Sequence, residues 1–430
     1  MKYVTDDAAF VAEVSGVRSV PSLARFEKRP RNAARLLVDP DFASVFWGKL
    51  FGFAGVTIQT LVTSLMAFEA TGSAFAVGLV NAALFAPQVL VGPWSGAAAD
   101  RGWATHQIIA GRLVSAASVG ALAVWTATSD LAGWKAIAVM CAACWVAGTG
   151  LAIGGAAMNS LVPQLVARSE LPVAMSLNTV PVSVARVAGP ALGAYVFASS
   201  GAVVALWWAA AGHAVFAIFV LAVRPPGGPR LPRSSAGQVR AAWAYVLHDD
   251  RLLLRLLLAV TFIGFGSEPV FILAPTYADG FGGGAALVGS MSASFGVGAA
   301  LGLVLSFVGE SRLPHARTAC VGFWLLTAAA AGCAVVQSSA LAHVAFAVAG
   351  AGFTLAMAGV NTLLQLRIPN ELRGRVMAMW MIGLVGARPI TALFVGSLAD
   401  LWSDRIAFGA TAVLMAGATW AFRPARIAGT

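Results

Sequence analysis

Residues 161–193 read LVPQLVARSELPVAMSLNTVPVSVARVAGPALG and contain a short charged turn followed by a long apolar run. The turn holds Arg168 and Glu170, and the run continues to about residue 198 with Arg186 as its one charge. About 20 apolar residues in a helix match the hydrocarbon thickness of a lipid bilayer. The stretch therefore predicts a membrane-spanning helix at 172–198 with a cation near its middle.

The same pattern occurs again in the second half of the chain. LRIPNELRGRVMAM at 366–379 resembles VPQLVARSELPVAMSL at 162–177, and YVLHDDRLL at 245–253 resembles LLVDPDF at 36–42. At an offset of 202 residues, Arg388 of a second apolar run falls on Arg186. An internal repeat of this kind predicts two halves of similar architecture.

The composition excludes several classes of protein. The chain has 430 residues, of which 59% are hydrophobic and 11% are charged, and its mean hydropathy is +0.81. A soluble domain carries about 25% charged residues, so a soluble, disordered or fibrous protein is excluded. The apolar runs are long and continuous rather than alternating segments of about ten residues, which argues against a β-barrel. We therefore predict an all-α polytopic membrane protein.

Apolar runs bounded by charged or turn residues predict twelve membrane-spanning helices in two sets of six. The expected spans are 43–68, 75–98, 107–128, 133–157, 172–198, 201–223, 252–275, 284–308, 317–337, 339–364, 377–398 and 404–422. The expected organisation is a basic cytoplasmic tail at 1–40, an N-terminal six-helix bundle at 41–223, a cytoplasmic linker at 224–250, a C-terminal six-helix bundle at 251–423 and a cytoplasmic tail at 424–430.

The basic residues predict the orientation in the membrane. Of the 28 Lys and Arg residues, 23 lie in the tails or in the loops on the same side as the tails. Lys135 and Arg405 lie on the opposite side, and Lys49, Arg186 and Arg388 lie inside spans. Because loops rich in Lys and Arg stay in the cytoplasm, we expect a multi-pass protein of the bacterial inner (plasma) membrane with both termini cytoplasmic. The net charge of +10 therefore indicates topology and not nucleic-acid binding.

Three segments in order resemble the major facilitator superfamily over residues 36–425, and within it the exporter branch that includes the enterobactin exporter and macrolide efflux proteins. They are TGSAFAVGLV…APQVLVGPWSGAAADR at 71–101, the stretch at 161–193, and PNELRGRVMAM at 369–379. The resemblance implies two six-helix bundles related by pseudo-two-fold symmetry, with a substrate bound between them near the midplane.

The resemblance also implies gating residues. In the loop after the second span, Gly96, Asp100 and Arg101 match a latch in which the Asp meets the start of a helix in the other half. A carboxylate at a helix N-terminus gains about 0.3–1 kcal/mol, which can bias a gate. Arg373, in the signature before span 377–398, is assigned to the same gate. The alternative for this loop is a solvated turn whose basic residue only reflects the general excess of Lys and Arg in cytoplasmic loops.

Span 172–198 holds Gly189, Pro190 and Gly193, which resemble the family's antiporter motif. The two glycines share one helix face and allow a close neighbour, and the proline bends the helix. The resemblance implies export by exchange, and the alternative is plain helix packing. Gly298 and Gly302 in span 284–308 predict another close-packing face.

Three charges lie deep in the predicted spans. An Arg near the middle of a membrane costs about 2.5–3.5 kcal/mol, so Arg186 and Arg388 should face the interior or a wet cavity. They could hold an anionic part of the substrate, tune a proton-carrying carboxylate, or bind carbonyls freed by prolines. Glu268 is the candidate proton carrier, and its alternative place is the outer vestibule.

Neutral polar side chains could line the same pathway or bond neighbouring helices. They are Gln59, Asn81, Gln88, Asn178 and Asn361. We expect Lys49 to reach the cytoplasmic surface and His213 to be peripheral. Cys141 and Cys144 have metal-like spacing but lie in mid-span among small apolar residues, so we expect no metal site and no cofactor.

The resulting hypothesis is a secondary active transporter that exports a small organic molecule, such as a drug or siderophore, by alternating access with proton antiport. The alternative is an uptake facilitator or symporter on the same fold. We expect no enzyme, because acids, His and Cys do not gather at one membrane face. The expected partners are the substrate, the bilayer and protons, and the expected state is a monomer.

Overall fold

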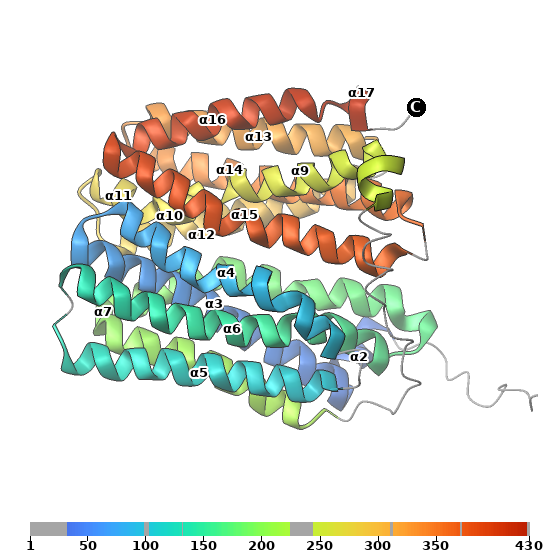
Figure 1. Ribbon diagram of the computed structural model, residues 1–430, viewed down its shortest axis with the longest axis horizontal. Coiled ribbons are helices and arrows are strands. Elements are labelled where there is room, and N and C mark those ends of the chain that lie inside the picture. Colours follow the sequence, from blue (N-terminus) through green and yellow to red (C-terminus); the bar gives the residue numbers. More distant parts are fainter. Residues whose placement is uncertain are drawn as a thin grey trace, which may run out of the picture.

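The computed structural model describes residues 32–98, 103–130, 132–223, 244–309, 313–369 and 372–427. All regular structure in these ranges is helical, and the long helices run roughly side by side in two layers (Figure 1). This arrangement confirms the predicted all-α polytopic fold. Most of the predicted tail 1–40, most of the linker 224–250 and the last residues of the tail 424–430 lie outside the described ranges.

The first layer contains the helices before the linker. They are α2 (Ala33–Val38), α3 (Pro40–Thr71), α4 (Ala74–Ala98), α5 (Ala104–Thr128), α6 (Gly133–Leu165) and α7 (Leu171–Leu221), with the 3-10 turn η2 (Arg168–Glu170) before α7. The predicted spans 172–198 and 201–223 both fall in α7. Gly201, with φ of 82°, separates them. This left-handed conformation favours glycine and turns the chain back on itself.

The second layer contains the helices after the linker. They are the π-turn η3 (Tyr245–Asp249), α9 (Arg251–Ser267), α10 (Pro269–Ile272), α11 (Ala274–Asp279), α12 (Ala285–Gly309), α13 (His315–Val335), α14 (Ser339–Arg367), α15 (Arg373–Leu401), α16 (Asp404–Ala421) and α17 (Pro424–Ile427). In the described part of the chain, ten helices are long and apolar enough to cross a membrane. With α7 covering two spans, these ten account for every predicted span except 404–422, which corresponds to α16.

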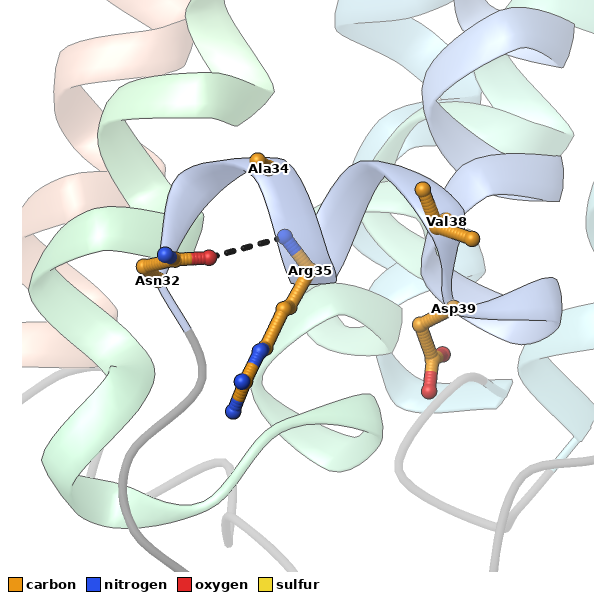
Figure 2. A pocket seen from close by; sticks show the side chains of 5 residues that line it. All are labelled: Asn32, Ala34, Arg35, Val38 and Asp39. Carbon is orange, nitrogen blue, oxygen red and sulfur yellow. Dashed lines mark hydrogen bonds between the residues drawn. The ribbon is translucent and has the colours of Figure 1, made fainter.

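The helix ends have identifiable caps. Asn32 accepts a hydrogen bond from the amide of Arg35 at the start of α2, where both residues line a shallow surface pocket (Figure 2). Asp39 accepts one from the amide of Phe42 at the start of α3. The side chain of Asp250 accepts bonds from the first amides of α9, as the pattern HDD predicts. Figure 1 places α2 and α17 at the same end of the bundle, which we call the termini end, and the opposite end is the far end.

The cap at Asp250 is also an ion pair, because Arg367 Nε lies 2.8 Å from its Oδ2. Burial acts to raise the pKa of Asp250, but hydrogen bonds from Arg367 and from the amides of Leu253 and Leu252 lower it below the ordinary 3.8. A carboxylate whose pKa is lowered by folding stabilises the fold above its unfolded pKa. That contribution is lost as the pH falls through the folded pKa.

Asp250→Asn is expected to lower the free energy of unfolding by about 1 kcal/mol at neutral pH, since the ion pair with the partly solvated Arg367 and the charge at the helix N-terminus are lost while Asn can still cap α9. The difference from wild type should stay constant from neutral pH down to weak acid and close only below the ordinary carboxyl pKa. Thermal unfolding of both proteins along a pH series measures it. A difference that persists in strong acid would contradict this role for the ionised carboxylate.

Glycines allow the helices within each half to pack closely. A Cβ atom on Gly148 of α6 would overlap the carbonyl oxygen of Leu84 in α4. In the second half, Gly298 and Gly302 of α12 face Ala347 and Ala351 of α14 in the same way. The predicted close-packing face of span 284–308 is therefore confirmed.

The two halves meet along α4 with α15 and along α7 with α12. A Cβ on Gly78 of α4 would overlap the carbonyl oxygen of Ala392 in α15, and a Cβ on Gly289 of α12 would overlap Ala194 of α7. By contrast, Gly92 near the termini end of α4 has nothing within 4 Å, and Leu90 is 59% exposed. The contact of α4 with α15 is therefore tight toward the far end, whereas a Cβ at Gly92 would meet no neighbour.

Candidate functional site

The structure brings the predicted interior charges to one place between the halves, which we call the central charge site (Glu268, Arg388 and Arg186). Glu268 lies at the break between α9 and α10, where Pro269 has no amide hydrogen to continue the helix. Its side chain is 5% exposed, and its Oε1 lies 2.7 Å from Nε of Arg388 in α15. The predicted proton carrier is thus ion-paired inside the second half.

Both arginines contact an aromatic ring of the opposite half. The guanidinium of Arg388 lies 4.5 Å from the ring centroid of Phe85 in α4. The guanidinium of Arg186 in α7 lies 4.7 Å from the ring centroid of Phe353 in α14. Cation–π contacts contribute about 0.5–2 kcal/mol. Each arginine therefore links the halves through a contact that can form and break without a strong penalty.

The three charges also interact with one another. Arg186 experiences the charges of both Arg388 and Glu268. With Glu268 ionised, the site carries one net positive charge, and protonation of Glu268 would remove its ion pair with Arg388. The freed guanidinium presents planar donors that suit a carboxylate or another flat acceptor. Arg388 would therefore be available to a ligand acceptor only when its pair with Glu268 is broken.

A second charged group lies in the first half, and we call it the basic cluster (Lys49, Arg112 and His213). Lys49 is 5% exposed, and its Nζ donates to Asn178 Oδ1 at 2.9 Å and to the Asn178 carbonyl at 3.3 Å. The expectation that Lys49 reaches the surface is therefore wrong, since a polar partner is available inside. Arg112, counted above among the loop cations, is also 5% exposed within α5.

The hydrogen bonds of the basic cluster determine the tautomer of His213. Nη1 of Arg112 lies 3.2 Å from Nδ1 of His213, and Nε2 of His213 lies 3.2 Å from Oε1 of Gln59. A guanidinium only donates, so Nδ1 must accept and Nε2–H must donate to Gln59. His213 is therefore neutral in this arrangement. In the described residues neither Lys49 nor Arg112 has a carboxylate partner. The cluster therefore joins α3, α5 and α7 through hydrogen bonds to uncharged side chains and through contacts of the cations with aromatic rings.

The antiporter-like motif packs α7 against α3. A Cβ on Gly189 would overlap the Thr57 side chain, and one on Gly193 would lie 3.3 Å from Cα of Ile58. The hydroxyl of Thr57 donates to the carbonyl of Ala185 at 3.2 Å. The Pro190 carbonyl faces Gly289 of α12 in the other half. The motif therefore lies where α7 contacts both its own half and the opposite one.

The remaining predicted residues are distributed along α4, α14 and α15. Asn81 is 3% exposed and donates to Ser64 Oγ at 2.9 Å, a bond that joins α4 to α3. Gln88 is half-buried in α4, and Asn361 has a buried Oδ1 without a recorded hydrogen bond.

The predicted gate at the termini end is only partly described. Gly96 lies in the last turns of α4, and Arg373 begins α15. Asp100 and Arg101 lie outside the described residues.

One polar contact between the halves involves a residue that the motif analysis does not single out. Asp400, at the far end of α15, accepts hydrogen bonds from the start of α4. The available signal was the spacing Gly396-x-x-x-Asp400, which repeats Gly96-x-x-x-Asp100. By the repeat, the counterpart of the loop after the second span is expected after span 284–308, at residues 309–312, and not at the end of span 377–398.

Comparison with known proteins agrees with this architecture. No curated protein matches the chain. Among solved structures it is similar to a point mutant of the nucleoside transporter NupG, with a TM-score of 0.72 and 13% identity over 88% of this chain and 98% of that one. A bacterial homologue of the iron transporter ferroportin in the inward-facing state gives a TM-score of 0.68 and 16% identity over 91% of this chain and 98% of that one.

A bacterial homologue of the human lysosomal transporter Spinster, inward-facing and unoccupied, gives a TM-score of 0.68 and 14% identity over 91% of this chain and 96% of that one. At these identities the likenesses establish the fold alone. The profile of the transmembrane secretion effector family matches residues 35–428, which is nearly the whole chain. This protein is therefore a membrane transporter of the major facilitator type and belongs to the transmembrane secretion effector family.

Proposed function

We propose that this protein exports a small organic molecule across the bacterial inner membrane by alternating access, in exchange for protons. Both termini lie in the cytoplasm in this proposal, because the basic residues concentrate at the termini end. The far end then faces outward. The close contacts of α4 with α15 toward that end, and the open Gly92 near the other, fit a transporter that is closed to the outside.

The observation that carries the proposal is the buried ion pair between Glu268 and Arg388. A proton that arrives from outside neutralises Glu268 and breaks the pair, and release of the proton to the cytoplasm restores it. Arg388 also contacts Phe85 of the other half. A change at Glu268 is thereby transmitted to a contact between the halves, which proton coupling to alternating access requires.

The charge of the site indicates which ligands can exchange with a proton. Protonation of Glu268 raises the net charge of the central charge site from one to two positive charges. An exchanged substrate must bind more weakly after protonation, and an anion would bind more tightly. Exchange with protons therefore favours a weakly basic molecule, such as an amphiphilic drug with an amine, over a simple anion.

A second candidate function is proton symport of an anion on the same fold. The same ion pair favours it, because protonation of Glu268 frees Arg388 for an anionic group and makes the two events cooperative. Symport would reverse the relation between substrate flux and the proton gradient. The sign of that coupling therefore distinguishes the two functions.

Transport into inverted membrane vesicles tests the proposal. The vesicle lumen is made acidic, and uptake of a macrolide and of a catecholate siderophore is measured with and without a protonophore. Antiport predicts accumulation in the acidic lumen together with alkalinisation of that lumen. Movement of substrate toward the alkaline side would support symport, and flux indifferent to the pH gradient would overturn proton coupling altogether.

A further inference from the structure

The contact at the far end joins the last turn of α15 to the first turn of α4. Oδ1 of Asp400 accepts a hydrogen bond from the amide of Ala74 at 2.7 Å, and Oδ2 accepts one from the amide of Phe75 at 3.2 Å. The hydroxyl of Ser73 donates to the same carboxylate. One side chain of the second half therefore receives three hydrogen bonds from the first half.

These bonds satisfy backbone amides at the start of α4 that have no acceptor within the helix. The first amides of a helix have no acceptor within it, and its N-terminus favours a negative charge. Ser73 supplies one local acceptor, since its Oγ accepts from the amide of Ala76 at 3.0 Å. The amides of Ala74 and Phe75 are instead capped by Asp400. A helix cap is normally local, so a cap from the opposite half is lost whenever the halves separate at this end.

Small residues bring the two helices close enough for this cap. Gly396 precedes Asp400 by about one helical turn, and a Cβ at Gly396 would lie 2.7 Å from the carbonyl oxygen of Ala74. Gly78, one turn further along α4, is in similar contact with Ala392. The cap and the glycine contacts lie on the same side of α15. They therefore form and separate together when the halves move.

The sequence spacing places a related pair of residues at the other end of α4. Gly96 lies in the last turns of α4 and Asp100 comes four residues later in the sequence, and Gly396 and Asp400 repeat their spacing at the end of α15. The family resemblance gives Asp100 the role of meeting a helix start in the other half. Asp400 makes a contact of the same type at the far end, because its carboxylate accepts hydrogen bonds from the start of a helix in the other half.

We propose that Asp400 is the far-end gate residue of this transporter: its carboxylate caps α4 while the far end is closed and releases it when that end opens. This inference goes beyond the proposed function, because it depends neither on the substrate nor on the coupling ion. It rests on the family's alternating access and on the three hydrogen bonds between the halves.

The gate can be tested with distance measurements between spin labels in the full-length protein in lipid nanodiscs. Labels at Ser200→Cys and Gln337→Cys report on the far end, and labels at Val38→Cys and Leu366→Cys report on the termini end. All four positions are exposed. The four native cysteines are replaced by alanine in every sample.

Asp400→Asn keeps the shape of the side chain but removes its charge, and Asp400→Ala removes both. We expect the ratio of far-end-open to far-end-closed molecules to rise about threefold in Asp400→Asn, which loses the charge but can still accept from the amides, and about tenfold in Asp400→Ala, which also loses the cap. The termini-end distance should shorten in the same samples. Coordinated changes of this kind require a folded protein, so they separate gating from unfolding.

A pocket at the far end is lined by both Asp400 and Asp279, together with Ser73 and Ala74. Asp279→Asn provides the matched control, because Asp279 is exposed and makes no hydrogen bond to α4 in the described residues. It should leave both distance distributions as in the wild type. Unchanged distributions in Asp400→Asn and Asp400→Ala would overturn the proposal. An equal shift in Asp279→Asn would also overturn it, since the pocket's overall charge and not the cap would then control the gate.

Discussion

Glu268→Gln is expected to abolish proton-driven transport while the protein remains folded in the membrane. Glutamine has nearly the same shape as glutamate but cannot lose a proton, so residue 268 would be held in an uncharged form like that of protonated Glu268. The ion pair with Arg388 Nε, at 2.7 Å in the wild type, would be lost. Substrate exchange without a proton gradient should persist at a lower apparent affinity, because the variant resembles the protonated form while the gates are intact.

The two partners of this ion pair should also show energetic coupling. Removing one partner of a buried pair costs about 3–5 kcal/mol, because the other charge is left without compensation. The Arg388 side chain is 26% exposed and contacts Phe85, so the cost here should lie at or below that range. Adding Arg388→Gln to Glu268→Gln should restore part of the thermal stability without restoring coupling.

The experiment compares pH-driven uptake, gradient-free exchange and thermal unfolding for each variant in the same vesicles. Glu69→Gln is a suitable control, since Glu69 is an exposed glutamate near the far end of α3 with no recorded ion pair. It should transport like the wild type. Normal pH-driven uptake by Glu268→Gln would show that protons are carried elsewhere and would remove the basis of the proposed exchange.

Gly298→Ala is expected to destabilise the second half strongly. A Cβ at this position would overlap the carbonyl oxygen of Ala347 in α14, and backbone atoms cannot move aside as a flexible side chain can. One turn further, a Cβ on Gly302 would lie 2.7 Å from the carbonyl oxygen of Ala351. The substitution must therefore push α12 away from α14 along this face. Overpacking of this kind costs about 1–3 kcal/mol, and the backbone partner places this site at the upper end.

The matched control is Gly417→Ala in α16, where nothing lies within 4 Å of the new Cβ. Alanine is the better helix former by about 1 kcal/mol, so this variant should be as stable as the wild type or more stable. Thermal unfolding of both purified variants in the same detergent gives the comparison. Equal melting temperatures for the two variants would show that the α12–α14 contact is looser than its geometry indicates.

Several features of the fold follow directly from the amino-acid sequence. Long apolar runs predict the spanning helices, because a bilayer imposes the same length and polarity on each of them. The HDD pattern predicts the cap at Asp250, and Gly298-x-x-x-Gly302 predicts a close-packing face. These signals are local, since the residues that carry them lie within a few turns of one another.

The depth of a charged residue was harder to predict. Arg112 lies only a few residues inside the predicted span 107–128 and resembles the loop cations beside it. In the structure it is buried against Phe216 and His213, which come from a helix about 100 residues later in the chain. Lys49 has a half-buried partner of the same distant origin in Asn178. Whether a cation near a helix end reaches water or an interior partner depends on which helix covers it.

For the candidate site too, some features can be predicted from the sequence and others depend on how the helices pack. That Arg186, Arg388 and Glu268 must face the protein interior can be predicted from the cost of a charge in lipid. Only the packed structure shows which partners these charges have. Glu268 pairs with Arg388, and each arginine contacts a ring of the opposite half. Asp400 and its donors at the start of α4 are 325 to 327 residues apart in the chain. Local patterns specify which residues must avoid lipid, and the packing of two separate bundles specifies which partner each of them meets.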